Sequence, residues 1–508
     1  MTRLSRWLES PWVAPAGLFL LALVILRWTL VPTLYTFDSA ELATAAYTLG
    51  LPHAPGYPLY MLLAHGFLQL PLGLDIAGRA NLFSALCLAG AVVGLYALLL
   101  RLFGERWLAL GTALVWLASY YVWSAGIVAE VYAAQALTLA WTGWALAALP
   151  QKTWRGALIG GALYGLALGV HPGSVLFAPA VALAYVLAGV RPVRCVGAGL
   201  ICALIFGMAL LYFPLRYSAG ASFSLLGEYN AAGQFVPVDL TTPSGILWVL
   251  RGAQFDKLFF GGGSLVDGLA RLIGWLLANF LGLGVLVGVA GVWALRHRLR
   301  LLLVWLVAVV PFILFYATYG APDVETMLLP LYLLWMLVFA AGWQWFSAAV
   351  GRQATFALFL YAAALLVVNF PLVDGSRDDS VRRRATYLME ALPPESVVFG
   401  GWFDVVPLEY QQIVEGARPD VRLMNLFLFE EPALEAYLET LWINGGECRG
   451  EACLAPTMRN RPIVILGARE SVERLPLPVG RLQALTMDAP LDDIEALRLE
   501  AYRLVNQP

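Results

Sequence analysis

Charged residues are scarce in this chain of 508 residues. Asp, Glu, Lys and Arg make up 13% of it, against about 25% in an average soluble protein, and hydrophobic residues make up 60%. So little charge excludes an ordinary soluble enzyme, and so much apolar material excludes a disordered chain. The formal net charge of −2 excludes a broadly basic nucleic-acid-binding protein, and no nucleic-acid partner is expected.

Histidine and cysteine are also rare, with four and five residues. Their spacing does not resemble a zinc site, and the sequence shows no Gly-rich phosphate loop and no serine or cysteine nucleophile motif. Two of the cysteines, Cys448 and Cys453, flank a short polar loop near the C-terminus. We expect them to form a disulfide if this loop lies outside the cytoplasm, and two idle thiols are the alternative.

The charge that is present is unevenly distributed. Of the 66 charged residues, 36 lie in residues 374–508, although this is the shorter part of the chain. Residues 1–373 instead contain apolar runs close to the roughly 20 residues that cross a membrane as a helix. The predicted fold class is therefore a polytopic α-helical membrane protein with a small C-terminal α/β soluble domain. About eleven spans are expected, at 13–34, 81–103, 107–124, 131–149, 156–171, 173–190, 195–216, 269–294, 301–318, 327–349 and 354–373.

Helices and strands alternate in the predicted C-terminal domain. Apolar periodicity predicts helices and strands there, which is typical of a small α/β domain. The predicted helices are 380–391, 407–415, 432–442 and 491–505, and the predicted strands are 396–400, 421–429 and 462–466.

The basic residues predict the orientation of the membrane domain. If the N-terminus is cytoplasmic, 12 of the 18 Lys and Arg before residue 374 fall in cytoplasmic junctions, as the positive-inside rule requires. Eleven spans then place the C-terminal domain outside, together with two long loops at about 35–80 and 217–268. Acidic residues collect on this same outer side. Because acids do not drive topology, their position suggests a function.

Asp38 and Glu41, just after the first predicted span, form the sharpest candidate site. At positions i and i+3 they would share one face of a helix. Carboxylates at a membrane boundary cost free energy unless they are solvated, paired with a cation or part of a functional site. One of the two carboxylates could act as a general base that faces a cavity, with the other beside it. The pair could also hold Mg²⁺ or Mn²⁺, although two carboxylates are few ligands for either ion. The structural alternative is a capping box, with Asp38 as N-cap.

Four more residues are candidates for substrate binding. His53 and Tyr57 lie in a segment whose two prolines and glycine would hold them in place, unless that segment is only a structural turn. Glu130 is the single acid of its short predicted outer loop, where a merely solvated acid is the alternative. His171 precedes a proline at the outer end of a predicted span, where a packing role is the alternative.

Arg216 and Arg251 are among the few basic residues of the predicted outer segments. Cations beside a membrane surface suit a lipid-linked phosphate, which arginine can bind with two parallel hydrogen bonds. An ion pair with a loop acid such as Glu228 or Asp256 is the alternative.

Several segments together resemble a known family. The stretches Asp38-Ser-Ala-Glu41-Leu, His53-Ala-Pro-Gly-Tyr-Pro58 and Arg79-Ala-Asn81 are similar to the start of bacterial membrane proteins related to a eukaryotic transmembrane protein O-mannosyltransferase. Those proteins belong to the GT-C glycosyltransferase superfamily. Similar landmarks follow later in the chain, at Ala129-Glu-Val-Tyr132, Gly169-Val-His171, Phe213-Pro-Leu-Arg216 and Gly401-Trp-Phe-Asp404.

The resemblance implies an activity and a location. A sugar, with mannose as the candidate, would pass from a polyprenyl-phosphate donor to an extracytoplasmic protein or glycan acceptor at a bacterial inner membrane. Asp38 would be the catalytic base with Glu41 beside it, Glu130 would lie near the same cavity, and Arg216 near the donor phosphate. A transporter or flippase of lipid-linked sugars and a non-catalytic envelope scaffold are the competing hypotheses.

Overall fold

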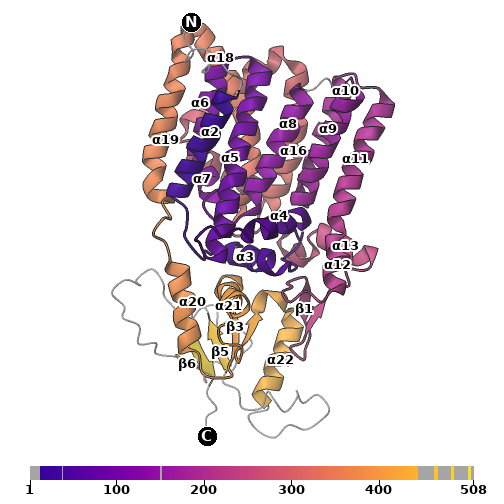
Figure 1. The fold of residues 1–508 in the computed structure, drawn as a ribbon, viewed down its shortest axis with the longest axis vertical. Helices are drawn as coiled ribbons and strands as arrows, with labels where there is room; N and C mark the ends of the chain where they lie inside the picture. The colour runs from indigo at the N-terminus through magenta and orange to yellow at the C-terminus, as the bar shows by residue number, and fades with distance from the viewer. Residues whose placement is uncertain are drawn as a thin grey trace.

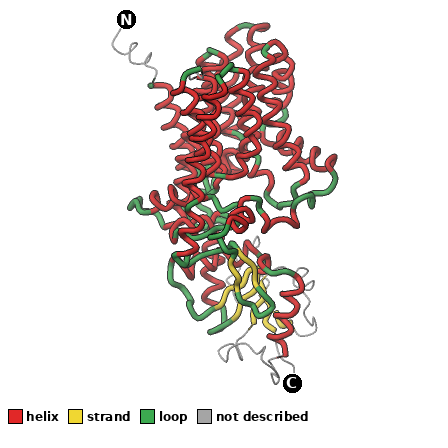
Figure 2. The backbone as a smooth tube through the Cα atoms, turned by 90° about the vertical axis from the view of Figure 1, so that its right-hand side faces the viewer, coloured by secondary structure: helices red, strands yellow, loops and turns green. Residues whose placement is uncertain are grey.

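The computed structural model of the protein describes residues 12–36, 38–148, 152–443, 463–466, 482–484 and 501–504. A tall bundle of helices stands on a smaller α/β domain, and short helices lie between the two (Figures 1 and 2). The first described helix begins at the end of the bundle that faces away from the α/β domain (Figure 1). The start of the first described helix and the α/β domain therefore lie at opposite ends of the molecule.

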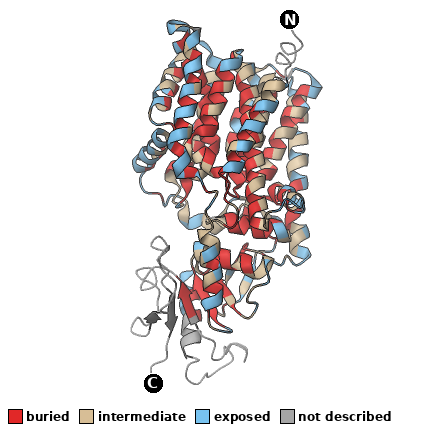
Figure 3. Ribbon diagram, turned by 60° about the vertical axis from the view of Figure 1, so that its left-hand side comes forward, coloured by how far each residue is buried: buried red, intermediate tan, exposed pale blue. Residues whose placement is uncertain are grey.

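Each predicted span overlaps with helix in the described residues, but the count of about eleven is not confirmed, and the first described helix ends at Trp28, before the end of the span predicted at 13–34. Five of these helices are long and apolar enough to cross a membrane, or up to six if a bent pair counts as one. The outside of the bundle exposes apolar side chains such as Leu200, Leu286 and Leu360, as a lipid-facing surface does, whereas its centre is buried (Figure 3). The helices are α2 (Val13–Trp28), α5 (Ile76–Phe103), α6 (Arg106–Ala118), α7 (Tyr120–Ala125), α8 (Val131–Ala148), α9 (Trp154–Val170), α10 (Ala178–Leu187), α11 (Pro192–Leu210), α12 (Tyr212–Ser218), α14 (Leu265–Asn279), α15 (Leu283–Ala294), α16 (Leu299–Thr318), α17 (Val324–Met327), α18 (Leu329–Val350) and α19 (Ala357–Val373).

The prediction of one continuous span at 269–294 is wrong. The chain breaks between α14 and α15 and turns by 111°, because Leu281 and Gly282 adopt left-handed φ angles of 45° and 71°. The break is held by other helices: the Tyr361 hydroxyl donates to the Phe280 carbonyl at 2.5 Å, and the Asn279 side chain accepts from the Tyr121 N–H at 2.9 Å. Hydropathy reports apolar length but not backbone conformation, so it could not reveal this bend.

Two loop regions cover the end of the bundle that faces the α/β domain. The first contains α3 (Ser39–Thr48) and α4 (Pro58–Leu68). The second contains a hairpin of β1 (Gly227–Tyr229) and β2 (Phe235–Pro237), followed by α13 (Pro243–Leu250) and η2 (Ala253–Leu258). Backbone hydrogen bonds join the two regions, from Leu51 N to Phe223 O and from Leu225 N to Leu51 O, each at 2.9 Å.

The α/β domain is built on a mixed sheet in the strand order β4-β3-β5-β7-β6. The first three strands of that order are parallel, and β7 runs antiparallel to both of its neighbours. A small apolar core of its own includes Leu388, Val398, Val405 and Val464. The elements are α20 (Ser380–Ala391), β3 (Val397–Gly400), α21 (Trp402–Val414), β4 (Arg422–Asn425), α22 (Glu431–Ile443), β5 (Ile463–Leu466), β6 (Leu482–Ala484) and β7 (Ala501–Leu504).

Three predictions for this domain are wrong in detail. The strand predicted over 421–429 ends at Asn425 in β4, and a short 3-10 helix, η5 (Leu426–Leu428), follows it. A helix was expected over 491–505, but Ala501–Leu504 forms β7, which pairs with β5 on one side and β6 on the other. These pairings join segments far apart in sequence and override the local periodicity. The helix expected from Pro407 begins earlier, at Trp402, because Gly401 provides an extended N-cap and Pro407 is accommodated inside the helix.

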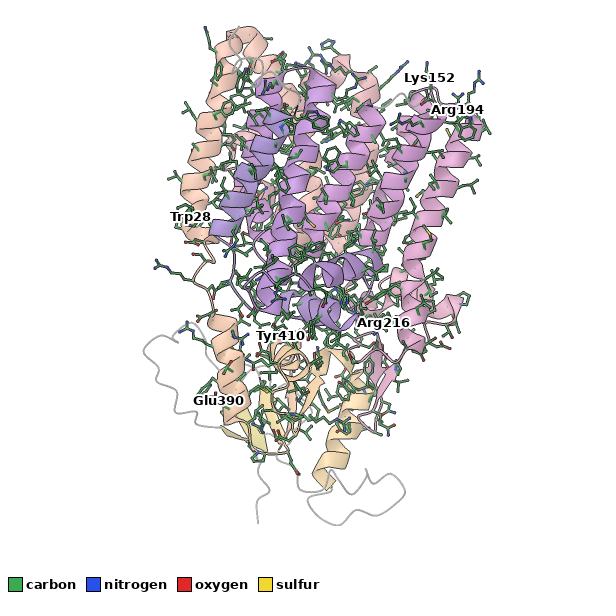
Figure 4. The ribbon with its side chains drawn as sticks, in the orientation of Figure 1. Trp28, Lys152, Arg194, Arg216, Glu390 and Tyr410 are labelled. Carbon is green, nitrogen blue, oxygen red and sulfur yellow. The ribbon has the colours of Figure 1, made fainter. Side chains whose placement is uncertain are left out.

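The α/β domain is fastened to both loop regions. Arg382 pairs with Asp75 of the first loop region at 3.2 Å. The Tyr410 hydroxyl, at the boundary between the domain and the bundle, accepts from Ala77 N at 3.2 Å (Figure 4). Arg422 donates to the carbonyl of Gly233 in the second loop region. These contacts place α21 directly beneath α3 and make the domain a wall of the cavity described below.

Candidate active site

The segment before α3 is held by one buried side chain. Asn81 of α5 donates to the carbonyls of Val31 and Thr33 at 2.8 and 2.9 Å and accepts from the N–H of Ala129 at 2.8 Å. It therefore ties the end of the first helix to the loop before α8. The family-like Arg79-Ala-Asn81 segment is thus part of the scaffold that positions Asp38.

Asp38 and Glu41 do not form a capping box. Asp38 occupies the position before α3, but its side chain makes no capping hydrogen bond. Glu41 is fully buried and accepts a hydrogen bond from the backbone N–H of His53 at 2.6 Å. Both of its oxygens also lie 2.9 Å from His53 Nδ1. The structural alternative for this pair is therefore wrong, because Glu41 is committed to His53 instead of to the start of its own helix.

His53 lies between two carboxylates. Its Nε2 is 3.6 Å from Asp38 Oδ2 and 2.8 Å from the Tyr57 hydroxyl, while its Nδ1 faces Glu41. Burial alone lowers the pKa of His53, but Glu41 and Asp38 outweigh burial and raise it to about 9. His53 is therefore an imidazolium at neutral pH, and it carries the positive charge that balances the two acids.

Asp38 has the properties of a base that works near neutral pH. Burial raises the pKa of its carboxyl to about 6, with the positive charge of His53 acting against the rise and Glu41 adding to it. The carboxylate is thus mostly ionised at neutral pH but still basic enough to accept a proton. Its side chain keeps 15% of its surface exposed, toward a cavity.

The segment that carries His53 and Tyr57 is a tight turn rather than a strand or helix. Gly56 has φ of +85°, and a Cβ there would lie 2.5 Å from the Phe213 ring. Tyr57 is itself left-handed, with φ of 46°, and it begins α4. The turn directs the Tyr57 hydroxyl back onto His53, so the structural role and the candidate binding role of this segment coincide.

The cavity has a volume of about 760 Å³ and lies where the bundle, the two loop regions and the α/β domain meet. The bundle and its loops supply ionisable and aromatic side chains, and the α/β domain supplies Trp402, Phe403 and Phe427. The polar residues that line it include Asp38, His53, Tyr57, Tyr132, His171, Arg251, Tyr316, Tyr319 and Asp323.

Among the predicted site residues, Asp38, His53, Tyr57, His171 and Arg251 line the cavity. His171 is also a packing residue. Its Nδ1 accepts from the N–H of the glycine two residues later at 3.0 Å, and its ring lies 5.2 Å from that of Tyr57. His171 therefore both lines the cavity and packs against its neighbours, as the two alternatives from the sequence proposed.

Glu130 lies behind the described cavity lining. It is 4% exposed, so the alternative of a solvated loop acid is wrong. Its backbone is held by Ser84, which donates to its carbonyl and accepts from its N–H, and its Oε2 has no hydrogen-bond partner in the described structure. Burial, and then the charge of Asp38, raise the pKa of Glu130 well above its ordinary value. Its surroundings therefore favour the neutral, protonated form of Glu130 over the carboxylate.

The two candidate arginines have different environments. Arg216 donates to the carbonyls of Leu49 and Thr48 at 2.6 and 3.4 Å, and it does not belong to the described lining of the cavity. Arg251 does line the cavity and pairs with Asp256 at 3.1 Å. More than half of the Arg251 side chain and half of that of Asp256 are exposed, and an ion pair of this kind is weak enough to exchange partners.

Two cavity residues were not singled out from the sequence. Asp323 precedes α17, and burial raises its pKa to about 7, with the charge of Asp38 adding to the rise. In the sequence it was only one of the acids expected on the outer side. Trp402 packs edge-on against His53, with ring centroids 5.6 Å apart. The only feature of the sequence that pointed to Trp402 was its position in the family-like Gly401–Asp404 segment.

The same cluster was tested for its fit to a metal ion. Asp38, Glu41 and His53 could each offer one ligand atom, and these atoms lie within 4.8 Å of one another. An imidazole ligand suits Zn²⁺ better than the Mg²⁺ or Mn²⁺ considered from the sequence. Binding would require His53 to lose its proton and to break its contacts with Glu41 or Tyr57, so the set fits an ion pair better than a metal site. Cys448 and Cys453 lie outside the described residues, and their disulfide stays a prediction.

The fold defines a class of membrane protein. Over 98% of this chain and 99% of the other, it is similar to the crystal structure of ArnT from Cupriavidus metallidurans bound to undecaprenyl phosphate, with a TM-score of 0.58 and 13% sequence identity. The apo structure of ArnT matches with a TM-score of 0.55, 14% identity and 99% of each chain. Nearly the whole chain therefore has the same overall fold as ArnT.

A sequence relationship covers the N-terminal part. The family model described as the Protein O-mannosyl-transferase TMEM260 N-terminal domain matches residues 38–193. Mouse Protein O-mannosyl-transferase TMEM260 is 36% identical over 129 residues, which are 24% of this chain and 18% of the mouse protein. The chain thus spans less than a fifth of the length of this relative. Together, these findings confirm the resemblance to the GT-C superfamily, and the matched region contains Asp38, Glu41 and His53.

Proposed function

We propose that the protein is an integral-membrane glycosyltransferase that moves a sugar from a polyprenyl-phosphate donor to an extracytoplasmic protein or glycan acceptor. One observation carries the proposal: the Asp38 carboxylate, 3.6 Å from His53 Nε2, faces a cavity between the bundle and the α/β domain. ArnT was crystallised with undecaprenyl phosphate, which supports a donor of this kind. The name of the mouse relative supports mannose as the sugar.

In this proposal Asp38 is the general base. A hydroxyl of the acceptor becomes a good nucleophile when a carboxylate takes its proton as it attacks. The hydroxyl oxygen would form a bond to the anomeric carbon, the bond from that carbon to the phosphate oxygen would break, and polyprenyl phosphate would leave. With Asp38 as base and no covalent sugar–enzyme intermediate, this single displacement inverts the anomeric configuration.

The surrounding residues take supporting roles. His53 stabilises the ionised form of Asp38, and Glu41 fixes the orientation and charge of His53. Arg251 is the candidate for the donor phosphate, because it lines the cavity and can exchange Asp256 for a phosphate oxygen. We assign Arg216 a structural role instead, since its guanidinium holds the backbone at Leu49.

The α/β domain is the candidate acceptor side of the cavity. Phe403 and Phe427 line the cavity and are still 40% and 41% exposed, which places them at its open edge. Aromatic faces at such an edge can pack against a peptide or a sugar ring. We propose a bacterial inner membrane with a cytoplasmic N-terminus and an extracytoplasmic α/β domain. A reporter that is active only in the periplasm, fused after residue 508, should then be active.

The activity can be tested directly with the reconstituted protein. Vesicles containing the protein, polyprenyl-phosphate mannose and an extract of envelope proteins and glycans should yield mannosylated product, detected by mass spectrometry. Vesicles with Asp38→Asn should not. Comparing envelope glycans from cells with and without the gene would identify the natural sugar and acceptor. Equal product from the Asp38→Asn protein would contradict the proposed role of this site, and movement of donor across the bilayer without transfer would favour a flippase.

A further inference from the structure

A second cavity, of about 510 Å³, lies inside the bundle and is separate from the one that contains Asp38. It is a cleft lined by α5, α8, α10, α16 and α18. α10 packs on α16, and α8 packs on α18, so the cleft lies between these two pairs. Its lining is apolar except for Thr142 and Arg300, and small residues such as Gly143, Ala184 and Ala308 leave the space open.

Arginines surround the end of the cleft that faces away from the α/β domain. Arg300, in the first turn of α16, lines the cleft, is exposed, and has no hydrogen-bond or ion-pair partner in the part of the chain that the structure describes. Two more guanidiniums lie beside the lining. Arg298 donates to the carbonyl of Leu102 at 3.0 Å, and Arg101 donates to the carbonyl of Ala147 at 2.9 Å, and both of these carbonyls belong to cleft residues. Lys152 and Arg194 lie at the same end of the bundle (Figure 4).

The other end of the cleft is closed by aromatic rings. Phe177 lines the cleft and stacks on Phe312 with centroids 5.4 Å apart. Phe312 in turn lies 4.5 Å from Tyr316, whose ring lines the Asp38 cavity. We refer to these three side chains, which lie between the linings of the two cavities, as the partition. An apolar chain that enters the cleft from the arginine end would meet this partition before it reached the proposed donor site.

We propose that this cleft binds an anionic phospholipid from the membrane leaflet on the arginine side. Acyl chains fit the apolar walls, and the phosphate matches the free guanidinium of Arg300 at the mouth, with Arg298 and Arg101 adding positive charge. A basic residue beside an anionic lipid surface strengthens binding by about fivefold. The lipid would fill a space that otherwise separates α8 and α10 and would stabilise the bundle by binding to its folded form.

The proposal can be tested by native mass spectrometry of the full protein in detergent. Phosphatidylglycerol should be retained in preference to phosphatidylcholine, and it should raise the thermal unfolding midpoint. Arg300→Gln should weaken phosphatidylglycerol retention by about fivefold. Arg296→Gln is the matched control, because it removes the same charge from the same end of the bundle, but the Arg296 guanidinium packs on the Trp293 ring at 4.0 Å and does not line the cleft.

Ala184→Phe provides a second test, because it fills the cleft without changing charge. It should abolish specific retention of phosphatidylglycerol while leaving sugar transfer unchanged, so this result does not depend on the proposed function. Unfolding midpoints in lipid-free detergent identify a variant that is simply misfolded. Equal losses in Arg300→Gln and Arg296→Gln would overturn the proposal in favour of diffuse attraction. Retention by a folded Ala184→Phe protein, equal retention of phosphatidylcholine, or displacement of the lipid by polyprenyl phosphate would also overturn it.

Discussion

The two cavities of the bundle differ in the chemistry of their walls, although the contacting rings of Phe177, Phe312 and Tyr316 connect their linings. The cavity next to the α/β domain is lined by acids, histidines and tyrosines that come from loops and helix ends. The cleft on the other side of the partition is lined by leucines, alanines and valines in the middle of helices, with one arginine at its mouth.

The difference indicates how the proposed reactive site and the proposed lipid site could share one bundle. Ionisable groups are tolerated where loops and a folded domain replace the membrane around them, whereas the helix interiors accept only apolar ligands. Asp38 and His53 can be charged because each has a partner of opposite sign. The predictions below test whether catalysis depends only on the residues of the Asp38 cavity.

The largest expected effect comes from Asp38→Asn. An amide cannot accept the proton of the acceptor, so transfer should fall by about 10²–10⁴-fold, as is usual when a general base is removed. Expression and unfolding midpoint should change little, because the Asp38 side chain makes no capping hydrogen bond. Initial rates in reconstituted vesicles measure the loss. Glu41→Gln should fall less, since Glu41 acts through His53. Near-normal transfer by Asp38→Asn would contradict the assignment of Asp38 as the base and of its cavity as the active site.

The pH dependence of transfer should report the same carboxyl. Burial raises the pKa of Asp38 to about 6, and the base must be deprotonated to work. The ratio kcat/KM should therefore rise with pH up to about 6 and then level off. Below that value it should fall about tenfold for each pH unit. A rate that is independent of pH between 5 and 7 would contradict this assignment.

The two arginines allow a smaller but sharper test. Arg251→Lys should weaken the apparent affinity for the polyprenyl-phosphate donor by about tenfold, because lysine lacks the planar pair of donors that matches a phosphate. Arg216→Lys is the control. It loses a hydrogen bond to the backbone at Leu49, so it should lower stability by about 1 kcal/mol and leave donor affinity unchanged. If both variants bind the donor as tightly as the unmodified protein, Arg251 does not bind the donor phosphate and only forms its ion pair with Asp256.

The smallest effect is expected from metal removal. Because His53 is protonated and engaged with Glu41 and Tyr57, treatment with EDTA should leave the transfer rate unchanged, and added Mn²⁺ should not raise it. A rate that EDTA abolishes and Mn²⁺ restores would instead make Asp38, Glu41 and His53 metal ligands.

The sequence predicted most of the helices but little of the geometry of the site. Apolar length located the membrane helices because it depends on local composition, yet the bend after Asn279 depends on two left-handed residues and on partners in other helices. Asp38 was identified from its position and its family-like motif. The contacts around it were not predicted: the hydrogen bond from His53 to Glu41 and the approach of Asp323 depend on tertiary packing that no spacing reveals.

The aromatic wall supplied by Trp402 and Phe427 has a consequence for the order in which the protein matures. The cavity draws on residues from Asp38 to Phe427, so nearly the whole chain must be synthesised before it is complete. The helices that carry the acid emerge first, and the domain that covers it folds last. A partly synthesised chain thus lacks the aromatic side of the cavity even when all of its acids are already in place.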